Sequence, residues 1–479
     1  MRLLIFFFLF YRRFIQMLNY KVKIGLVPER RFLPGPRRTE LFSQDVAFQN
    51  KQKAVRFLKE KFASDDVEFV DLEWLNDEGI LEQTADAYKI ADHFKKQDVD
   101  AIFIINCNFG NEEAAGKIGQ LMKLPTLLWG PRDEFKTKRY TDTQCGLFSI
   151  SKQLKRYNVP FTYIENCEIE DPKFEQGFND FLSIVTMVKN FYRLRIMQVG
   201  TRLKPFKCVM ANELELTERF GIDVIPVNMI AMKSKFEEVT VSKKETIEMH
   251  VEFIKKHYDV SDIEPETLFK MAAFIETFRD LMIENHCDVI ATECWTVMNQ
   301  AFGAMPCLAM SILADLGVIV ICETDIHGAI TSALLSCAAR GKKAPFFGEF
   351  TVRHPSNDNS ELLWHCGVFP TSMKKTDEKK PLAVFKPSFC GKDGHYTLAR
   401  FQGERGNYYL LGGEFDTTDG PETFGTWVWA EFKDLPALER KLIEGPYIHH
   451  VSEVEGRFTN VLKEFTKYVP GLIFDPLEK

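Results

Sequence analysis

The sequence has little concentrated positive charge. Its 61 Lys and Arg residues are outnumbered by 68 Asp and Glu residues, which gives a net charge of −7 over 479 residues. Binding to nucleic-acid phosphates requires a dense basic surface, and no Lys/Arg cluster here is accompanied by aromatic residues suited to stacking on bases. The composition therefore predicts that the protein has no nucleic-acid partner.

Paired cysteines are also missing. The eleven cysteines are odd in number and scattered, and none belongs to a CxxC motif. This usage is typical of a reducing compartment and disfavours a disulfide framework or a structural zinc site. We therefore expect a cytoplasmic protein.

The N-terminus lacks an apolar run of membrane-spanning length. The run from Leu3 to Phe10 is far shorter than the roughly 20 residues that a helix needs to cross a bilayer, and its charges, Arg12 and Arg13, follow it. A secretory signal would carry positive charge before the run and a small-residue cleavage site after it. We interpret residues 1–16 as an extended or mis-assigned start, with Met17 opening the domain. The alternative is a peripheral membrane tether, and stable membrane insertion is not expected.

Two further absences narrow the class of protein. No GxGxxG motif follows the first predicted strand, which disfavours a nicotinamide-dependent oxidoreductase on a Rossmann fold. No internal repeat or low-complexity linker is present. With 45% hydrophobic and 27% charged residues the chain is typical of a globular protein, and at about 150 residues per domain its 479 residues predict about three domains.

Apolar strand-like runs alternate with helical stretches from Tyr20 onward. Strands are expected at 22–27, 67–72 and 101–106, with helices over about 43–62 and 84–97. Strands that alternate with helices predict a parallel sheet. After the third strand, 106–111 (Asn-Cys-Asn-Phe-Gly-Asn) is either a substrate contact or a simple capping turn, because ligands of such sheets bind beyond the carboxyl ends of strands.

The predicted fold class is α/β and multidomain, with doubly wound parallel-sheet domains followed by a β-rich C-terminal domain. We place an N-terminal α/β domain at 17–142 and a second α/β domain at 143–343. After about Ala344 the pattern changes to short alternating strands separated by Gly, Pro and Asn. Residues 344–479 are therefore assigned to the β-rich domain.

Three segments place acidic or imidazole groups where apolar strands stop. They are 291–295 (Ala-Thr-Glu-Cys-Trp), 322–329 (Cys-Glu-Thr-Asp-Ile-His-Gly-Ala) and 445–451 (Gly-Pro-Tyr-Ile-His-His-Val). Carboxylates and an imidazole in one cleft would suit a divalent cation such as Mn²⁺ or Mg²⁺. Each segment alone also has an ordinary explanation: Asp325 could cap a helix, Glu293 could pair with a basic residue, and His449 and His450 could be satisfied by neighbours.

The run from Glu323 to Thr331 resembles the acid-x-Asp-x-x-Gly-Ala-(Leu/Ile)-Thr segment of L-fucose isomerases. Glu293 is similar to the Glu that these enzymes place after the preceding strand, and His450 resembles the C-terminal metal histidine shared with arabinose isomerases. The resemblance covers roughly 190–475 and implies a metal-dependent aldose–ketose isomerase. It also implies a homo-oligomer, a trimer or hexamer, with sites completed by a neighbour's N-terminal domain.

The resemblance implies a role for each candidate residue. Glu293 and Asp325 would be catalytic carboxylates and, with His450, ligands of a divalent metal, foremost Mn²⁺, with Mg²⁺ or Co²⁺ as alternatives. His365 falls where arabinose isomerases carry a further histidine, and it is predicted to contact substrate or metal.

Two more residues are candidates for binding the sugar. Trp295 would suit stacking on a sugar face, and Arg202 could reach the substrate. The stretch from 301 to 316 forms an additional apolar helix between Glu293 and Asp325, which indicates a divergent branch. The sugar stays open among fucose, arabinose, a related deoxy sugar and a sulfonated hexose. The rival interpretation is a non-catalytic sugar-binding or regulatory protein on the same scaffold.

Overall fold

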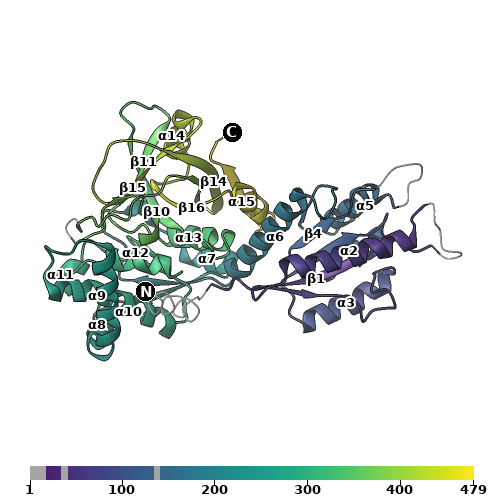
Figure 1. The fold of residues 1–479 in the computed structure, drawn as a ribbon, viewed down its shortest axis with the longest axis horizontal. Coiled ribbons are helices and arrows are strands. Elements are labelled where there is room, and N and C mark those ends of the chain that lie inside the picture. The colour runs from purple at the N-terminus through teal and green to yellow at the C-terminus, as the bar shows by residue number, and fades with distance from the viewer. Residues whose placement is uncertain (1–17, 34–40, 134–140, 383–384, 479) are drawn as a thin grey trace. The chain divides into compact units, whose positions relative to one another are not determined.

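The computed structural model describes residues 18–33, 41–133, 141–382 and 385–478, and the chain divides into two compact units. The first, here called the N-terminal unit, contains Tyr20–Lys189 and Lys467–Pro470. The second, the C-terminal unit, contains Asn190–Thr466 and the chain from Gly471 onward (Figure 1). The predicted segment 1–16 lies outside the described residues. No helix among the described residues has the length and apolar character needed to cross a membrane.

The N-terminal unit is built on a five-stranded parallel sheet with the order β2-β1-β3-β4-β5. Its strands are β1 (Val22–Glu29), β2 (Val67–Val70), β3 (Ala101–Asn106), β4 (Thr126–Trp129) and β5 (Phe161–Tyr163). Its helices are α2 (Gln44–Phe62), α3 (Thr84–Lys96), α4 (Glu112–Met122), α5 (Thr143–Arg156) and α6 (Pro172–Phe191). The predicted alternation of strands and helices is confirmed.

Helices cover both faces of this sheet (Figure 1). Phe103 and Ile105 of β3 pack with residues of α2 and α6 on one face, whereas Ile102 and Ile104 pack with α3, α4 and α5 on the other. Successive side chains of a strand point to opposite faces, so a strand covered on both faces is apolar throughout. This is why 101–106 is a continuous apolar run in the sequence.

The strand order reverses between β1 and β3, and the segment 106–111 lies at that point. Its side chains mainly support the local backbone: Asn108 Oδ1 accepts hydrogen bonds from the amides of Arg31 and Gly110, and Asn111 caps the start of α4. The capping interpretation of this segment is therefore observed. A substrate contact here stays a prediction.

Glu29, the last residue of β1, is an isolated buried acid at the same edge. Its side chain is fully buried, and Oε2 accepts a hydrogen bond from the Asn111 amide at 2.6 Å. Burial raises the pKa of Glu29 from 4.5 to about 8, and the Asn111 hydrogen bond and the charge of Arg31 only partly oppose this. A carboxyl group whose pKa is raised in the folded state favours folding at pH values below the pKa that it has in the unfolded state. This stabilisation is lost as the pH rises toward the pKa that it has in the folded state.

Glu29→Gln is therefore expected to change how stability depends on pH. Glutamine has no proton to lose. Between about pH 5 and pH 9 the free energy of unfolding of the variant should therefore rise relative to that of the wild-type protein, by about 1.4 kcal/mol for each unit by which the pKa of Glu29 is raised. Urea unfolding at both pH values measures the difference. The exposed Glu60→Gln on α2 serves as the control, and equal pH dependence of both variants and wild type would contradict the expectation.

The C-terminal unit combines a parallel sheet with a larger, mostly antiparallel one. The parallel sheet has the order β7-β6-β8-β9, with β6 (Arg195–Val199), β7 (Asp223–Val227), β8 (Val289–Thr292) and β9 (Val320–Cys322). Around it lie α7 (Glu213–Phe220), α8 (Met229–Ser242), α9 (Lys244–His257), α10 (Pro265–Glu284), α11 (Met298–Phe302), α12 (Cys307–Asp315) and α13 (Ile326–Ala338).

The larger sheet has the order β12-β15-β11-β10-β16-β13-β14-β17, and an additional pairing of β14 with β15 closes it into a barrel. Its strands are β10 (Phe346–Arg353), β11 (Ser360–His365), β12 (Phe389–Cys390), β13 (His395–Glu404), β14 (Asn407–Thr418), β15 (Thr426–Glu431), β16 (His450–Glu455) and β17 (Leu472–Pro476). Helices α14 (Leu435–Glu444) and α15 (Thr459–Thr466) accompany it. The predicted fold class is confirmed.

The structure also places the predicted boundaries and the extra helix. The boundary after residue 142 falls between β4 and α5 inside the N-terminal unit, and the boundary after 343 falls between α13 and β10. The three-domain division stays a prediction. The stretch 301–316 is not one helix: α11 ends at Phe302 and is capped by Gly303, which adopts φ 70°, and α12 begins after Pro306. A left-handed glycine and a proline together separate the two helices.

Candidate active site

The strands of the C-terminal unit bring several polar side chains to one region. Glu293 follows β8, and Glu323 and Asp325 follow β9, its neighbour in the parallel sheet. The barrel strands contribute Glu349 from β10 and His450 from β16, which lie directly opposite each other. This is the edge at which parallel α/β sheets present ligands.

The turn after β9 is strained. Glu323 and Thr324 adopt φ values of 65° and 56°, in the left-handed region that residues with side chains rarely occupy. The Thr324 amide donates to the Thr292 carbonyl at 3.1 Å, and its hydroxyl donates to the Thr201 carbonyl at 3.0 Å. Such strain costs roughly 1–3 kcal/mol per residue and persists where surrounding contacts hold it, as at functional sites.

Glu323, His365 and His450 converge as a group of three buried side chains. Each offers one ligand atom, and the three atoms lie within 4.8 Å of one another. Their exposures are 8%, 2% and 0%. Among the described residues, Glu323 Oε2, His365 Nε2 and His450 Nε2 have no hydrogen-bond partner. Buried polar atoms are normally satisfied, so these three atoms are candidates for contact with a bound ligand.

Each member of this group is oriented by its other polar atom. Glu323 Oε1 accepts from Trp295 Nε1 at 3.1 Å, and His365 Nδ1 accepts from the Cys366 amide at 2.9 Å. His450 Nδ1 lies 3.0 Å from Asp325 Oδ2 and donates to it, so in the neutral ring Nε2 carries a lone pair. Burial lowers the pKa of His450, but Asp325 and Glu323 outweigh this and raise it. That lone pair faces Glu323 Oε2 at 3.0 Å without hydrogen-bond geometry. A cation between the two atoms would remove the repulsion.

Asp325 is buried and held by several groups. Its carboxylate caps α13 through the Gly328 amide at 2.9 Å, and Arg400 contacts it with Nη1 at 2.5 Å and Nη2 at 3.2 Å. Burial favours protonation, but Arg400 and His450 outweigh it and hold the pKa of Asp325 well below its usual range. A carboxylate that holds the far nitrogen of a ligand histidine fixes both its tautomer and its direction.

Glu349 lies on the more open side of the group. Its Oε2 is 3.7 Å from His450 Nε2 and 3.5 Å from His449 Nε2, and its side chain is 18% exposed. Burial raises the pKa of Glu349; the nearby His365 and His450 oppose the rise, and Glu323 adds to it. A carboxyl group with a raised pKa at a partly open site is suited to exchanging protons.

The other predicted residues have different environments. Glu293 accepts hydrogen bonds from the Thr201 amide at 2.9 Å and the Thr296 hydroxyl at 2.9 Å, and it is not part of the group of three. Arg202 Nη1 donates to two carbonyls of its own loop, those of Leu203 and Phe206, both at 3.0 Å. The structure thus joins Asp325, His450, His365 and Trp295 in one network, while Glu293 and Arg202 stabilise neighbouring loops.

Sequence reasoning missed three residues of this network. Glu323 stands in the quoted motif two positions before Asp325, so the motif itself was a signal for it. Arg400 could also have been found, because it is a lone charge within the apolar run of β13, and the structure shows it fully buried there. Glu349 could not, because only the pairing of β10 with β16 places it beside His450.

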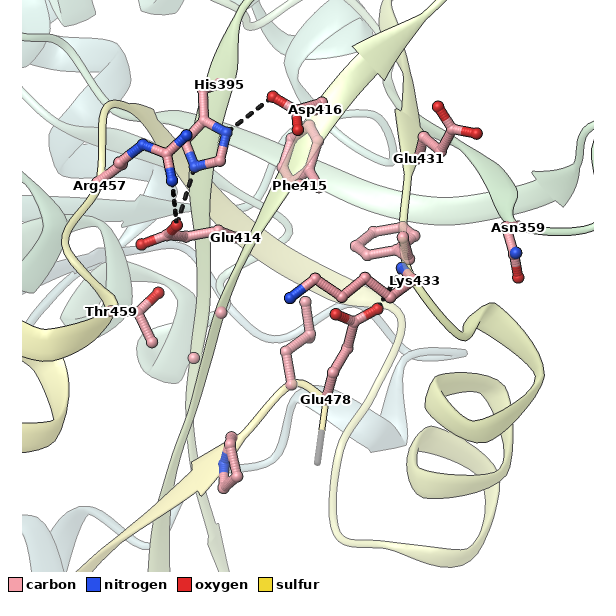
Figure 2. Close-up of a pocket in the computed structure, with 15 residues that line it drawn as sticks. Asn359, His395, Glu414, Phe415, Asp416, Glu431, Lys433, Arg457, Thr459 and Glu478 are labelled. Atoms are coloured by element: carbon pink, nitrogen blue, oxygen red, sulfur yellow. Dashed lines mark hydrogen bonds and ion pairs between the residues drawn. The ribbon is translucent and has the colours of Figure 1, made fainter.

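A separate cavity opens in the barrel and contains none of these residues (Figure 2). Its volume is about 770 Å³, and Figure 2 shows His395 between Glu414 and Asp416. The two ring nitrogens lie 2.9 Å and 2.7 Å from these carboxylates. Both nitrogens are therefore occupied by protein partners, and the candidate site remains the group around His450.

Comparison with known proteins tests the family resemblance inferred from the motifs. A family model described as the N-terminal domain of fucose/sulfoquinovose isomerase matches residues 36–192. Proteins called sulfoquinovose isomerase from Priestia aryabhattai and Priestia megaterium are 25% identical over 443 residues, covering 90% of this chain and 96% of theirs. These matches support the fucose isomerase-like superfamily. The resemblance inferred from the motifs is thereby confirmed.

Further comparisons agree with this assignment or add nothing to it. A superfamily member from Alkalicoccus urumqiensis, also called sulfoquinovose isomerase, is 24% identical over 376 residues, covering 76% of this chain and 83% of its own. Among solved structures, a periplasmic solute binding protein with bound D-allose aligns over 67% of this chain and 91% of its own, at 9% identity and a TM-score of 0.17. That score is too low to indicate a shared fold.

Proposed function

We propose that this protein is a metal-dependent aldose–ketose isomerase whose divalent ion is held by Glu323 and His450, with His365 beside them. The observation that carries the proposal is the convergence of two buried ligand atoms, Glu323 Oε2 and His450 Nε2, neither with a hydrogen-bond partner among the described residues. Similarity to the superfamily, with relatives called sulfoquinovose isomerase, supports the same chemistry. The predicted set of Glu293, Asp325 and His450 is thus revised to one that shares only His450.

The donor set fits a borderline divalent ion. A carboxylate and an imidazole suit Mn²⁺ or Co²⁺, whereas Mg²⁺ prefers oxygen ligands alone. When bound, such an ion supplies Lewis-acid stabilisation of negative charge on the sugar oxygens. Asp325, itself held by Arg400, keeps His450 Nε2 aimed at the ion.

The proton transfers are assigned to carboxylates that can change protonation state. Isomerisation moves a proton between two adjacent carbons, and Glu349, with its raised pKa and partly open position, is the group proposed to remove and return it. Glu293, predicted to be catalytic, is proposed to serve the hydroxyl proton from its position after β8. Asp325 is proposed to position His450, because its depressed pKa makes it a poor proton acceptor.

The mouth of the site offers an aromatic surface and positive charge. Trp295 is 45% exposed, and its ring centroid lies 6.1 Å from that of Phe206, which suits stacking against a sugar. Lys204 and Lys207, on the same loop as Phe206, are exposed. We propose that these lysines favour an anionic sugar, and the names of the relatives indicate sulfoquinovose, a hexose with a sulfonate on C6.

The decisive experiment is a substrate screen. Purified protein with Mn²⁺ would be incubated with sulfoquinovose, fucose, arabinose and glucose, and ketose formation followed by NMR. We expect a ketose from sulfoquinovose, and a Lys204→Met/Lys207→Met variant should raise KM for that sugar more than for a neutral one. If every sugar is bound but none converted, the non-catalytic sugar-binding alternative replaces this proposal. A homo-oligomer and a cytoplasmic location stay predictions.

A further inference from the structure

The hydrogen bond between His365 and its own chain decides which ring nitrogen carries a hydrogen. The Cys366 amide donates to Nδ1 at 2.9 Å, so Nδ1 is the acceptor and the hydrogen of the neutral ring is on Nε2. Burial lowers the pKa of His365, but the charges of Cys366, Glu323 and Glu349 outweigh this and raise it to about 10. An imidazolium also carries a hydrogen on Nε2, so this nitrogen is a donor in either state.

The ring of His365 is held in a fixed direction. It is 2% exposed, and the ring plane lies within 7° of that of Trp364. Its centroid is 5.3 Å from that of Phe347, and the His365 carbonyl accepts from the Thr426 hydroxyl at 3.3 Å. With Nδ1 held as well, the direction of the Nε2 hydrogen is set before any ligand binds.

This donor has no acceptor in the protein. Nε2 is buried and has no hydrogen-bond partner among the described residues. Because Nδ1 is occupied, Nε2 is the nitrogen available to the group with Glu323 and His450, whose ligand atoms lie within 4.8 Å of one another. Buried N–H groups are normally paired, so this one is a candidate for contact with a bound molecule.

The three atoms of the group differ in what they offer. Glu323 Oε2 and, in the neutral ring, His450 Nε2 present lone pairs to each other at 3.0 Å, whereas His365 presents a hydrogen. A cation would suit the first two atoms and be repelled by the third. An oxygen of the substrate lying between the cation and His365 would accept the hydrogen. The group therefore suits a cation and a sugar oxygen together.

The two histidines also differ in their outer contacts. A histidine that binds a metal through one nitrogen almost always donates from the other, as His450 Nδ1 does to Asp325. His365 does the opposite, because its Nδ1 accepts. Ligation through Nε2 would require the ring hydrogen to move to Nδ1 and the bond to Cys366 to break.

We propose that His365 is a catalytic residue that donates from Nε2 to a sugar oxygen and is not a ligand of the cation. This inference rests on the proposed function. When the carbon-bound proton moves to Glu349, negative charge grows on the adjacent sugar oxygen. A fixed donor aimed at that oxygen stabilises the charge more in the transition state than in the sugar itself. His365 keeps its hydrogen throughout.

Two substitutions of His365 distinguish a donor from a ligand. His365→Phe keeps a ring but has no donor, and His365→Gln returns an N–H group at about the same reach. Both should bind Mn²⁺ as tightly as wild type in a titration followed by electron paramagnetic resonance, since neither loses a ligand. His365→Phe should lower kcat for sulfoquinovose by roughly 10²- to 10³-fold, with a smaller change in KM, and His365→Gln should recover part of that loss. Circular dichroism checks that both variants fold.

His354→Phe is the matched control. His354 Nδ1 also accepts from a backbone amide, that of Ser356 at 3.1 Å, but His354 belongs to none of the candidate ligand groups. This variant should keep the wild-type kcat and Mn²⁺ affinity. The inference is overturned if His365→Phe binds Mn²⁺ more weakly than His354→Phe does, or if folded His365→Gln is as slow as His365→Phe.

A binding measurement keeps this inference separate from the proposed function. If wild-type protein with Mn²⁺ binds sulfoquinovose without converting it, the proposed function fails, and calorimetry then reports on His365 without turnover. His365→Phe should weaken binding of the sugar by roughly 2- to 10-fold, the effect of one lost hydrogen bond, while Mn²⁺ affinity stays unchanged. Equal sugar affinity of His365→Phe and wild type would overturn the donor role as well.

Discussion

Glu323→Gln is expected to lose Mn²⁺ binding and sugar isomerisation together. The substitution keeps the size of the side chain and its contact with Trp295, but it removes the charge from the oxygen that faces His450. The loss should exceed the roughly 10- to 100-fold penalty of removing an outer-shell partner, because Glu323 is proposed to touch the ion itself. Equilibrium binding of Mn²⁺ followed by electron paramagnetic resonance reports on this without requiring turnover.

Glu361→Gln provides the matched control. Glu361 lies on β11, four positions before His365, and its pKa is raised to about 7 by burial, opposed by Arg353. It belongs to none of the candidate ligand groups. Its substitution should leave Mn²⁺ affinity unchanged. Unaltered Mn²⁺ binding in Glu323→Gln would remove Glu323 from the ligand set and return Glu293 to consideration.

Arg400→Met is expected to destabilise the C-terminal unit strongly. Arg400 and Asp325 are both fully buried, and Nη1 lies 2.5 Å from Oδ2. Removing one partner of a buried pair leaves an uncompensated charge and typically costs about 3–5 kcal/mol. Thermal unfolding followed by circular dichroism should show a lower midpoint. Arg353→Met, which breaks the partly exposed pair with Glu439, should cost about 0–1 kcal/mol.

The double variant Arg400→Met/Asp325→Asn separates stability from function. Neutralising Asp325 removes the uncompensated charge, so the double variant should recover much of the stability lost by Arg400→Met alone. It should not recover activity, since His450 Nδ1 loses its charged partner. A double variant no more stable than Arg400→Met would show that the cost arises from lost packing of the arginine stem rather than from charge.

Local features of the sequence were enough to predict the architecture. The strand predicted at 101–106 matches β3 residue for residue, and the helix expected over 84–97 corresponds to α3. Apolar runs and turn residues reflect the local conformation of the chain. The helices and strands and their order can therefore be predicted without knowledge of tertiary contacts. The one long helix expected over 301–316 failed for a local reason as well, since Gly303 and Pro306 interrupt it.

Local sequence patterns predicted only part of the candidate site. The motif around Asp325 and the histidine pair ending at His450 located the region, because strand ends and short motifs are local. Their contacts are not local: Arg400 meets Asp325 across 75 positions, and Glu349 meets His450 only through the register of β10 on β16. Which of two carboxylates, Glu323 or Asp325, faces His450 Nε2 depended on the strained turn after β9.

By itself, then, the sequence determined the α/β architecture, the β-rich region that follows it and the resemblance to the superfamily, since periodicity, turn chemistry and short motifs act over a few residues. The closure of that region into a barrel came from the structure. Tertiary structure alone decided the partners of the charged groups, such as Arg400 for Asp325 and Glu323 for His450. Pairings of this kind arise from strand register and burial between segments far apart in the chain, and no spacing in the sequence encodes them.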